Sequence, residues 1–387
     1  MSPVDSTPAG SAPPPSGTNP LGFSLSFVAG TGVLALRDRP GGSLCLCEHL
    51  ELEIPDLTFP FDVSGGAGKF QHRRSRLRRA RLRIGAAEMA GFLATRPGVR
   101  AQGIEITDVR LRDGCAEVGG TARRSGATVA FTARAYLVPA GERAVRVSLA
   151  DVRVYGFLPW PAGLIGRALL LGCIAGQGDD GPRVRGIGDL EVDPLDEALF
   201  GVMPPAGWRL PDVAHARRRA LEVAATGVVL DYGPGEPAPT PPVPVRFAAR
   251  EEGARRFAAV DEELATGSLE AGRRACVAAV QRDGEQPYLV ERLLEILAAT
   301  PAGFDSATDL AGRTLAGRPD ATAALLAQAA VLLARGQPAE AATHLQRVSH
   351  LAVAAGDELE AVAGARAAAD LLVGGVPAGA APLLERI

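Results

Sequence analysis

Few cysteines, little net charge and no long uninterrupted apolar run mark this 387-residue chain, and each absence excludes a class of protein. The 5 cysteines are odd in number and lack the spacing of a disulfide framework, which indicates reduced thiols in a cytosolic protein. The net charge of −3 gives no overall attraction to nucleic acid or to an anionic membrane. Any site for an anionic partner therefore has to be a local basic cluster.

Targeting and membrane-spanning signals are also lacking. Residues 1–20 are rich in proline, serine and glycine and have neither the positive start nor the apolar core of a secretion signal, so we expect a disordered tail and a cytoplasmic protein. The most apolar stretch, Leu158 to Ala175, is interrupted by prolines and glycines and has only the minimum length of a membrane span. A transmembrane helix is therefore not expected.

Patterns that could carry catalysis or metal chemistry are incomplete. The glycine-rich stretch ending at Lys69 lacks the first glycine of a phosphate-binding loop, and Phe70 stands where that loop needs Ser or Thr. Cys45, Cys47 and His49 alternate along one predicted strand, where alternate residues lie roughly 6.6 Å apart and cannot converge on one zinc ion. No Ser/His/Asp set or carboxylate pair stands out, so we expect no catalysis, no cofactor and no metal.

The alternation of apolar and polar residues predicts strands through most of region 21–233, each with one buried and one wet face. Asp113-Gly114 is a hairpin turn among them. The phase slips by one residue near Ala150 and Asp151, which indicates a β-bulge that curves the sheet. Length and an apolar share of 47% allow two or more packed domains.

Two apolar helices are expected among these strands. The first carries Met89 and Leu93 at helical spacing and ends at Pro97, and the second follows Pro161, a residue suited to a first helical turn. The second helix is apolar nearly all round, so it must be buried or must line an apolar cavity.

The composition changes to Ala, Leu, Glu and Arg from residue 245, after a proline-rich segment, 234–244, that predicts a stiff linker. Glycines separate the helical segments downstream at intervals of about 34 residues. The clearest copy, 322–356, resembles the tetratricopeptide repeat: Ala329 and Ala341 stand at that family's small positions and Leu345 at a large apolar one. The resemblance implies an all-α helical-repeat domain over 245–387 that docks a partner protein.

Region 21–233 resembles the tubular lipid-binding (TULIP) group, in particular its small bacterial members. The resemblance rests on the order of a strand, the Phe59-Pro60-Phe61 turn, an arginine-rich strand, an apolar helix and the Asp113-Gly114 hairpin. It implies an α+β fold in which a curved antiparallel sheet wraps around helices and encloses an apolar groove for acyl chains. The chain departs from the bacterial members in lacking a secretion signal.

This resemblance and the apolar pattern together predict a lipid-binding site, although the same residues would also suit an ordinary core. The predicted lining residues are Phe59, Phe61, Met89, Leu93, Phe157, Leu158, Trp160, Leu164, Ile165 and Leu169.

An arginine run, 73–83, is the one strong basic cluster. Its later arginines alternate with Ala80, Leu82 and Ile84 and so share a wet face of one strand. We expect either a solvated strand edge that deters aggregation, or contact with an anionic headgroup, a membrane surface or a partner protein. The run lacks the interleaved aromatics that stack on bases, so nucleic acid is not expected. The predicted headgroup residues are Arg74, Arg76, Arg79 and Arg81.

The sequence therefore favours non-enzymatic binding of a lipid or another long apolar ligand by the first domain, with protein docking by the helical repeats. A ligand-free scaffold, whose first domain is simply a filled core, is the alternative. An enzyme ranks third.

Overall fold

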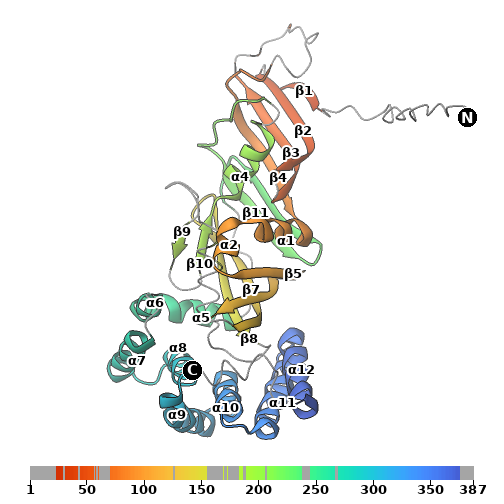
Figure 1. The fold of residues 1–387 in the computed structure, drawn as a ribbon. Helices are drawn as coiled ribbons and strands as arrows, with labels where there is room; N and C mark the ends of the chain where they lie inside the picture. The colour runs from red at the N-terminus through yellow and green to blue at the C-terminus, as the bar shows by residue number, and fades with distance from the viewer. Residues whose placement is uncertain are drawn as a thin grey trace, which may run out of the picture.

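The computed structural model describes residues 23–28, 31–41, 44–55, 57, 60, 70–124, 127–154, 169, 172, 183–185, 189–204, 207–237, 245–265 and 269–374. The described part is α+β up to residue 237 and all-α from residue 245, as the sequence predicts (Figure 1). The predicted N-terminal tail and most of the predicted linker, residues 238–244, lie outside the described residues.

The expected sheet is divided into two antiparallel six-stranded sheets. The first, sheet A, has the order β1-β2-β3-β4-β12-β11. Its strands are β1 (Phe23–Val28), β2 (Thr31–Gly41), β3 (Cys45–Ile54), β4 (Arg76–Ile84), β11 (Arg217–Ala224) and β12 (Gly227–Gly233). The predicted alternation is confirmed, since Ala80, Leu82 and Ile84 are buried while Arg79 is exposed.

One expectation for the arginine strand is wrong. Strand β4 lies between β3 and β12 in the interior of sheet A, so its arginines cannot protect a sheet edge. They occupy one face of a central strand instead, because the neighbouring strand on one side, β12, comes from a segment more than 140 residues later in the chain. Sequence alternation assigns a residue to a face, but it does not show which strands flank it.

Sheet B is a meander with the order β5-β6-β7-β8-β10-β9. Its strands are β5 (Ile104–Arg112), β6 (Cys115–Arg124), β7 (Ala127–Ala140), β8 (Ala144–Val154), β9 (Arg183–Arg185) and β10 (Asp189–Val192). The predicted turn is confirmed between β5 and β6, where Gly114 has a φ of +85°. The predicted bulge is confirmed as well: the pairing of β7 with β8 slips between Thr132 and Arg134, and Asp151 opposite has a φ of +48°.

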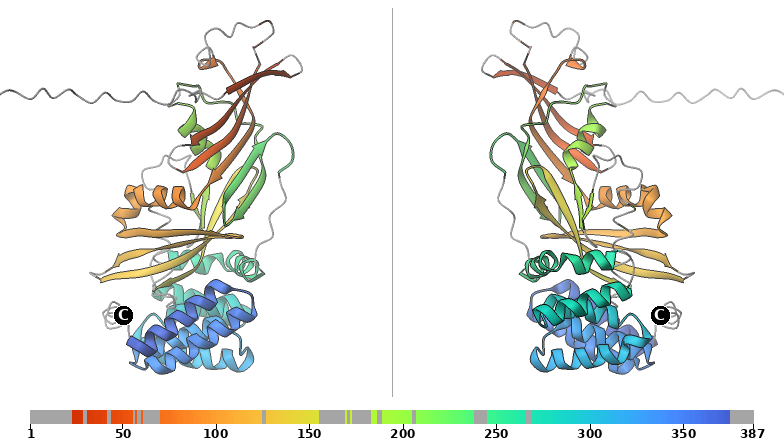
Figure 2. Two further views of the ribbon diagram at one scale, coloured as in Figure 1. Left: turned by 90° about the vertical axis from the view of Figure 1, so that its right-hand side faces the viewer. Right: turned by 90° about the vertical axis from the view of Figure 1, so that its left-hand side faces the viewer.

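The two sheets meet end to end at β11 (Figure 2). The amide of Gly114, in the β5–β6 turn, donates to the carbonyl of Val223 at 2.9 Å. The amide of Arg218 donates to the carbonyl of Glu142, in the β7–β8 turn, at 2.8 Å. These bonds satisfy part of the backbone at the edge of sheet A with the hairpin tips of sheet B.

Three short helices cover the inner faces of the sheets. The first predicted helix is confirmed as α1 (Ala86–Thr95), which is followed directly by α2 (Pro97–Ala101), and both pack on β5. Helix α4 (Pro194–Val202), which the periodicity does not predict, packs on β2, β3 and β4. Asp193 caps the N-terminus of α4: its carboxylate accepts a hydrogen bond from the amide of Leu195 at 3.1 Å.

The second predicted helix is described at only two positions, Leu169 and Gly172. A Cβ atom at Gly172 would lie 2.7 Å from the Cα of Val99 in α2. Only glycine permits so close an approach, so the chain at Gly172 packs against the backbone of α2.

The helical region, defined here as residues 245–374, is a chain of helices in which each packs on the next. Its helices are α5 (Val245–Arg256), α6 (Ala258–Ala265), α7 (Leu269–Asp283), α8 (Pro287–Leu297), α9 (Phe304–Gly317), α10 (Thr322–Ala334), α11 (Pro338–Ala354) and α12 (Glu358–Gly374), with a 3-10 turn at Pro301–Gly303. The architecture is repeat-like, and the predicted contact residues Ala329, Ala341 and Leu345 are fully buried in it. A helix fit to cross a membrane, in length and in apolar character, is not found among the described residues.

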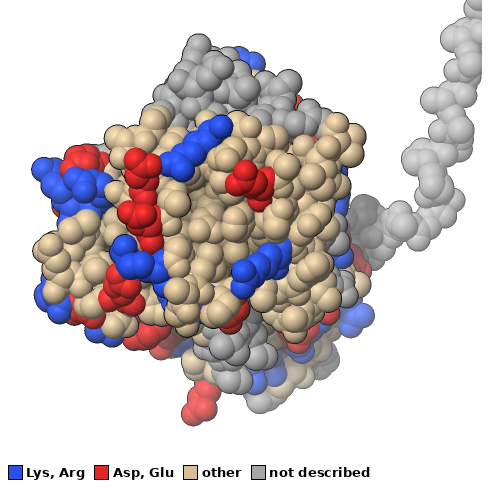
Figure 3. Space-filling view, turned by 90° about the horizontal axis from the view of Figure 1, so that it is seen from below, with Lys and Arg blue, Asp and Glu red and all other residues tan. Residues whose placement is uncertain are grey.

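The helical region covers the outer face of sheet B (Figures 1 and 2). Tyr136 of β7 stacks on Phe247 of α5 with ring centroids 4.3 Å apart. Seen from below, the opposite face of the helical region carries mostly uncharged residues with scattered charges (Figure 3).

A buried ion network completes this contact. Arg134 of β7 donates to both carboxylate oxygens of Asp357, at 2.9 and 3.0 Å, just before α12. The bulge residue Asp151 lies 3.5 to 3.7 Å from the guanidinium nitrogens of Arg134, Arg153 and Arg250. Glu360 of α12 is 3.9 Å from two of these arginines. Three cations thus face three carboxylates, so the buried charges are balanced.

Arg134→Met should therefore lower the free energy of unfolding of the full chain by about 3 kcal/mol, because it leaves buried carboxylates without their partner. Arg110→Met is the matched control: Arg110 pairs with Asp108 on the same sheet, but its side chain is 65% exposed, and we expect a loss under about 1 kcal/mol. Urea unfolding of both variants gives the comparison. Equal losses would mean that the network does not anchor the helical region.

Candidate functional site

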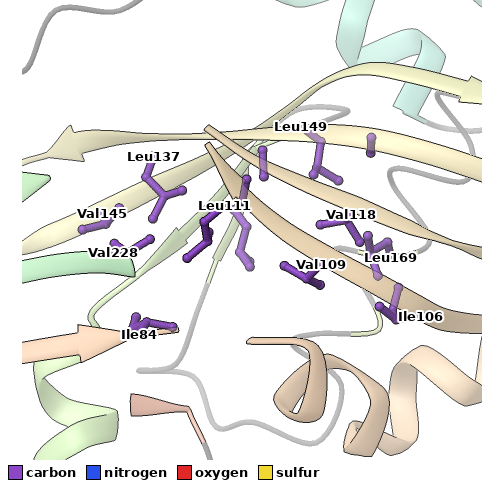
Figure 4. Packing of buried hydrophobic residues seen from close by; sticks show 14 of the residues in the cluster. Ile84, Ile106, Val109, Leu111, Val118, Leu137, Val145, Leu149, Leu169 and Val228 are labelled. Atoms are coloured by element: carbon purple, nitrogen blue, oxygen red, sulfur yellow. The ribbon is translucent and has the colours of Figure 1, made fainter. Parts of the chain in front are cut away.

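The inner faces of both sheets contribute to one cluster of buried apolar side chains, which continues into helices α8 to α12. Figure 4 shows Ile84 and Val228 of sheet A at one side of the cluster and residues of sheet B through the rest. Leu169 lies among them, next to Val118 and Val109, and is 3% exposed. Leu169 of the second apolar segment therefore lies in the apolar cluster beside residues of sheet B.

Helix α1 adjoins this interior without being buried in it. Met89, Ala90 and Leu93 pack against the cluster, yet no residue of α1 is fully buried. A Cβ atom at Gly91 would meet nothing within 4 Å. Two predicted lining residues, Met89 and Leu93, thus lie at the boundary between the apolar interior and solvent.

The C-terminal end of α1 is held to α4 by one exposed ion pair. The guanidinium of Arg96 stacks 3.8 Å above the ring centre of Phe92 and lies 3.2 Å from a carboxylate oxygen of Glu197 in α4. Because the Glu197 side chain is 46% exposed, this ion pair stabilises the contact by less than about 1 kcal/mol. The ion pair alone therefore adds little to the contact between α1 and α4.

Most of the other predicted lining residues cannot be placed. Phe59, Phe61, Phe157, Leu158, Trp160, Leu164 and Ile165 lie outside the described residues.

The outer face of sheet A carries the predicted headgroup arginines, and two of them are already paired across strands. Arg79 donates to Asp231 of β12 at 2.7 Å, and Arg81 donates to Glu48 of β3 at 3.0 Å. Burial of Glu48 opposes its ionisation, but hydrogen bonds from Arg83 and Arg81 outweigh it and lower the pKa of that carboxyl.

The other two predicted headgroup residues, Arg74 and Arg76, are exposed and form no ion pair with the described residues. Eight residue steps of about 3.3 Å place Arg76, at the start of β4, roughly 26 Å from Ile84 at its end. Met89 and Leu93, in the helix that follows Ile84, therefore lie toward the other end of the strand from Arg76.

The cysteines of β3 do not form a metal site. Cys45 and Cys47 are buried, whereas the pairing of β3 with β4 slips between Cys47 and His49, and the His49 ring lies 2.9 Å from Glu51. No group of three metal-binding side chains is found among the described residues.

Sequence reasoning missed one buried polar pair at the junction of the sheets. Arg218 of β11 is 2% exposed, and its cross-strand neighbour in β12, Tyr232, is fully buried. Two Arg218 nitrogens donate to the carbonyls of Ala144 and Gly141, the second at 3.5 Å. Neither the Arg218 Nε nor the Tyr232 hydroxyl has a hydrogen-bond partner among the described residues.

Burial shifts both groups of this pair. Desolvation lowers the pKa of Arg218 and raises that of Tyr232, because each charged form is costly away from water. The middle arginine of an Arg-Arg-Arg run gives no signal of burial in the sequence. It turns inward because the pairing of β11 with β12 slips between Arg218 and Ala220.

The thiols of Cys45 and Cys47 should resist alkylation. Burial raises the pKa of both to about 12, so at pH 8 about one thiol in ten thousand is ionised. Treatment with iodoacetamide at pH 8 followed by peptide mass spectrometry should find both unmodified in the native protein and both modified in urea. Native labelling would show that β3 is less buried than described.

Comparison of the chain with protein-family models, with curated proteins and with solved structures finds no significant match.

Proposed function

We propose that the sheet region, the part of the chain from β1 to β12, binds a lipid or another long apolar ligand between its two sheets, without catalysis. We also propose that the helical region docks a partner protein. The observation that carries the proposal is the position of α1. An apolar helix that packs on a continuous apolar interior while staying partly exposed is suited to cover an entrance. The resemblance of the sequence to tubular lipid-binding proteins adds support.

The exposed arginines fit a second step of this proposal, peripheral contact with an anionic membrane. Strand β4 begins at Arg76, at the end of sheet A away from the helical region (Figure 1). Arg74 and Arg76 form no ion pair with the described residues, whereas Arg79 and Arg81 do. Each arginine near an anionic surface contributes about 1 kcal/mol. The arginines would then bring the sheet region to a source of apolar ligand.

Protein docking is proposed for the helical region from its repeat-like stacking. Stacked helices present extended surfaces on which partner proteins bind. One face of the region is already covered by sheet B, which leaves the sparsely charged face of Figure 3 for a partner. Separate folding of the sheet and helical regions stays a prediction.

A ligand-free scaffold is the second candidate, and one observation favours it. Leu34, Leu50 and Leu52 of sheet A are fully buried, as they would be in a filled core. The two candidates differ in whether apolar molecules accompany the protein.

Replacing Met89 and Leu93 together by Gln should test the ligand. Both side chains are half-buried, so the variant keeps its fold while the affinity for an acyl chain falls about tenfold from the lost apolar contact. Acyl chains extracted per mole of purified protein and quantified by mass spectrometry give the readout. Ala87→Gln, at an exposed position of α1, is the matched control. Protein free of acyl chains in every form would favour the scaffold.

The membrane step predicts a contrast between two double variants. Arg74→Gln with Arg76→Gln should weaken binding to phosphatidylglycerol vesicles by roughly 2 kcal/mol, and Arg79→Gln with Arg81→Gln by much less, because the latter pair is neutralised by Asp231 and Glu48. Vesicle cosedimentation at low and high salt measures both. Equal binding by the two variants at low salt would remove the arginines from the proposal.

A further inference from the structure

The buried pair Arg218 and Tyr232 has hydrogen-bonding capacity that the described protein does not use. The hydroxyl of Tyr232 and the Nε of Arg218 are both inaccessible to solvent and without a partner. A buried donor left unsatisfied is destabilising, so this pair is suited to an acceptor that a ligand supplies.

The neighbouring carboxylates do not fill this role. Arg143 lies 2.5 Å from Asp193 and 3.0 Å from Asp196, so it pairs with the two acids whose charges raise the pKa of Tyr232. The guanidinium of Arg218 contacts only the neutral carbonyls of the β7–β8 turn and forms no ion pair within the described part of the chain.

The pair also borders the apolar interior. Tyr232 belongs to the apolar cluster, and Ala144, whose carbonyl accepts from Arg218, precedes Val145 of the same cluster. Val145 lies beside Val228 and Leu137 in Figure 4. Arg218 and Tyr232 are directly opposed across β11 and β12, so their side chains leave the same face of the sheet with Cβ atoms about 5 Å apart.

We propose that Arg218 and Tyr232 bind the anionic headgroup, a carboxylate or a phosphate, of the apolar ligand whose chain occupies the interior between the sheets. The inference rests on the proposed function and adds the chemical class of the ligand. Charged acceptors suit the site because a guanidinium and a hydroxyl together form charge-assisted hydrogen bonds with one oxyanion. The arginines of β4 are then not needed to recognise the ligand, since they lie on the outer face of sheet A.

Calorimetric titration of the full chain with oleate, oleoyl-lysophosphatidate and methyl oleate tests the proposal. One or both acids should bind at least tenfold more tightly than the ester, since a hydrogen bond to a charged group contributes about 1.5 kcal/mol or more. The preferred acid identifies the headgroup. Arg218→Met and Tyr232→Phe should each reduce this preference about tenfold, while Arg219→Met, an exposed position of the same strand, should leave it unchanged.

The Tyr232→Phe variant separates binding from folding. It deletes an unpartnered hydroxyl, so the melting temperature of the ligand-free protein should be equal to or above that of the parent chain. Equal affinity for acid and ester in the parent chain would overturn the headgroup site and leave the proposed function standing. Binding of none of the three ligands would overturn both.

Discussion

Burial on both faces of strand β7 is the constraint on which the rest of the structure depends. Residues 133–138 are buried one after another, alternately against the apolar interior and against the helical region. An arginine buried within such a strand destabilises the fold unless an opposite charge pairs with it. Arg134 pairs with Asp357 and Asp151. The bulge at Asp151 brings one carboxylate to three guanidinium groups. Packing of the two regions and curvature of sheet B therefore have a common origin.

Much of this fold follows from the sequence, for a physical reason. Period-two alternation fixes the buried face of a strand, and the slip at Asp151 and the glycine turn at Gly114 are local features that the chain encodes within a few residues. The interior position of β4 is not local, because it depends on β12. Helix α4 has local start signals in its capping Asp193 and in Pro194, but it is too short for an apolar period to stand out.

In the candidate site, too, some residues could be assigned from local sequence and others could not. Apolar residues such as Leu169 and Met89 could be assigned to the interior, because burial follows hydrophobicity. The charged residues could not be sorted, since whether an arginine is neutralised depends on cross-strand register: Arg79 meets Asp231, whereas Arg74 meets no described acid. Arg218 shows the limit most clearly. It is flanked by two arginines in the sequence, and only a one-residue slip between β11 and β12 directs it inward.

The contact between Arg134 and Asp357 joins residues 223 positions apart. During synthesis, β7 leaves the ribosome long before α12 is made. Until then, Arg134 on its outer face lacks its partner Asp357, and Tyr136 is uncovered until Phe247 of α5 follows. At a synthesis rate of about 5–20 residues per second, the nascent chain exposes this aggregation-prone, charged sheet surface for many seconds. The helical region, which is made later, thus covers a surface that the earlier part of the chain cannot satisfy alone.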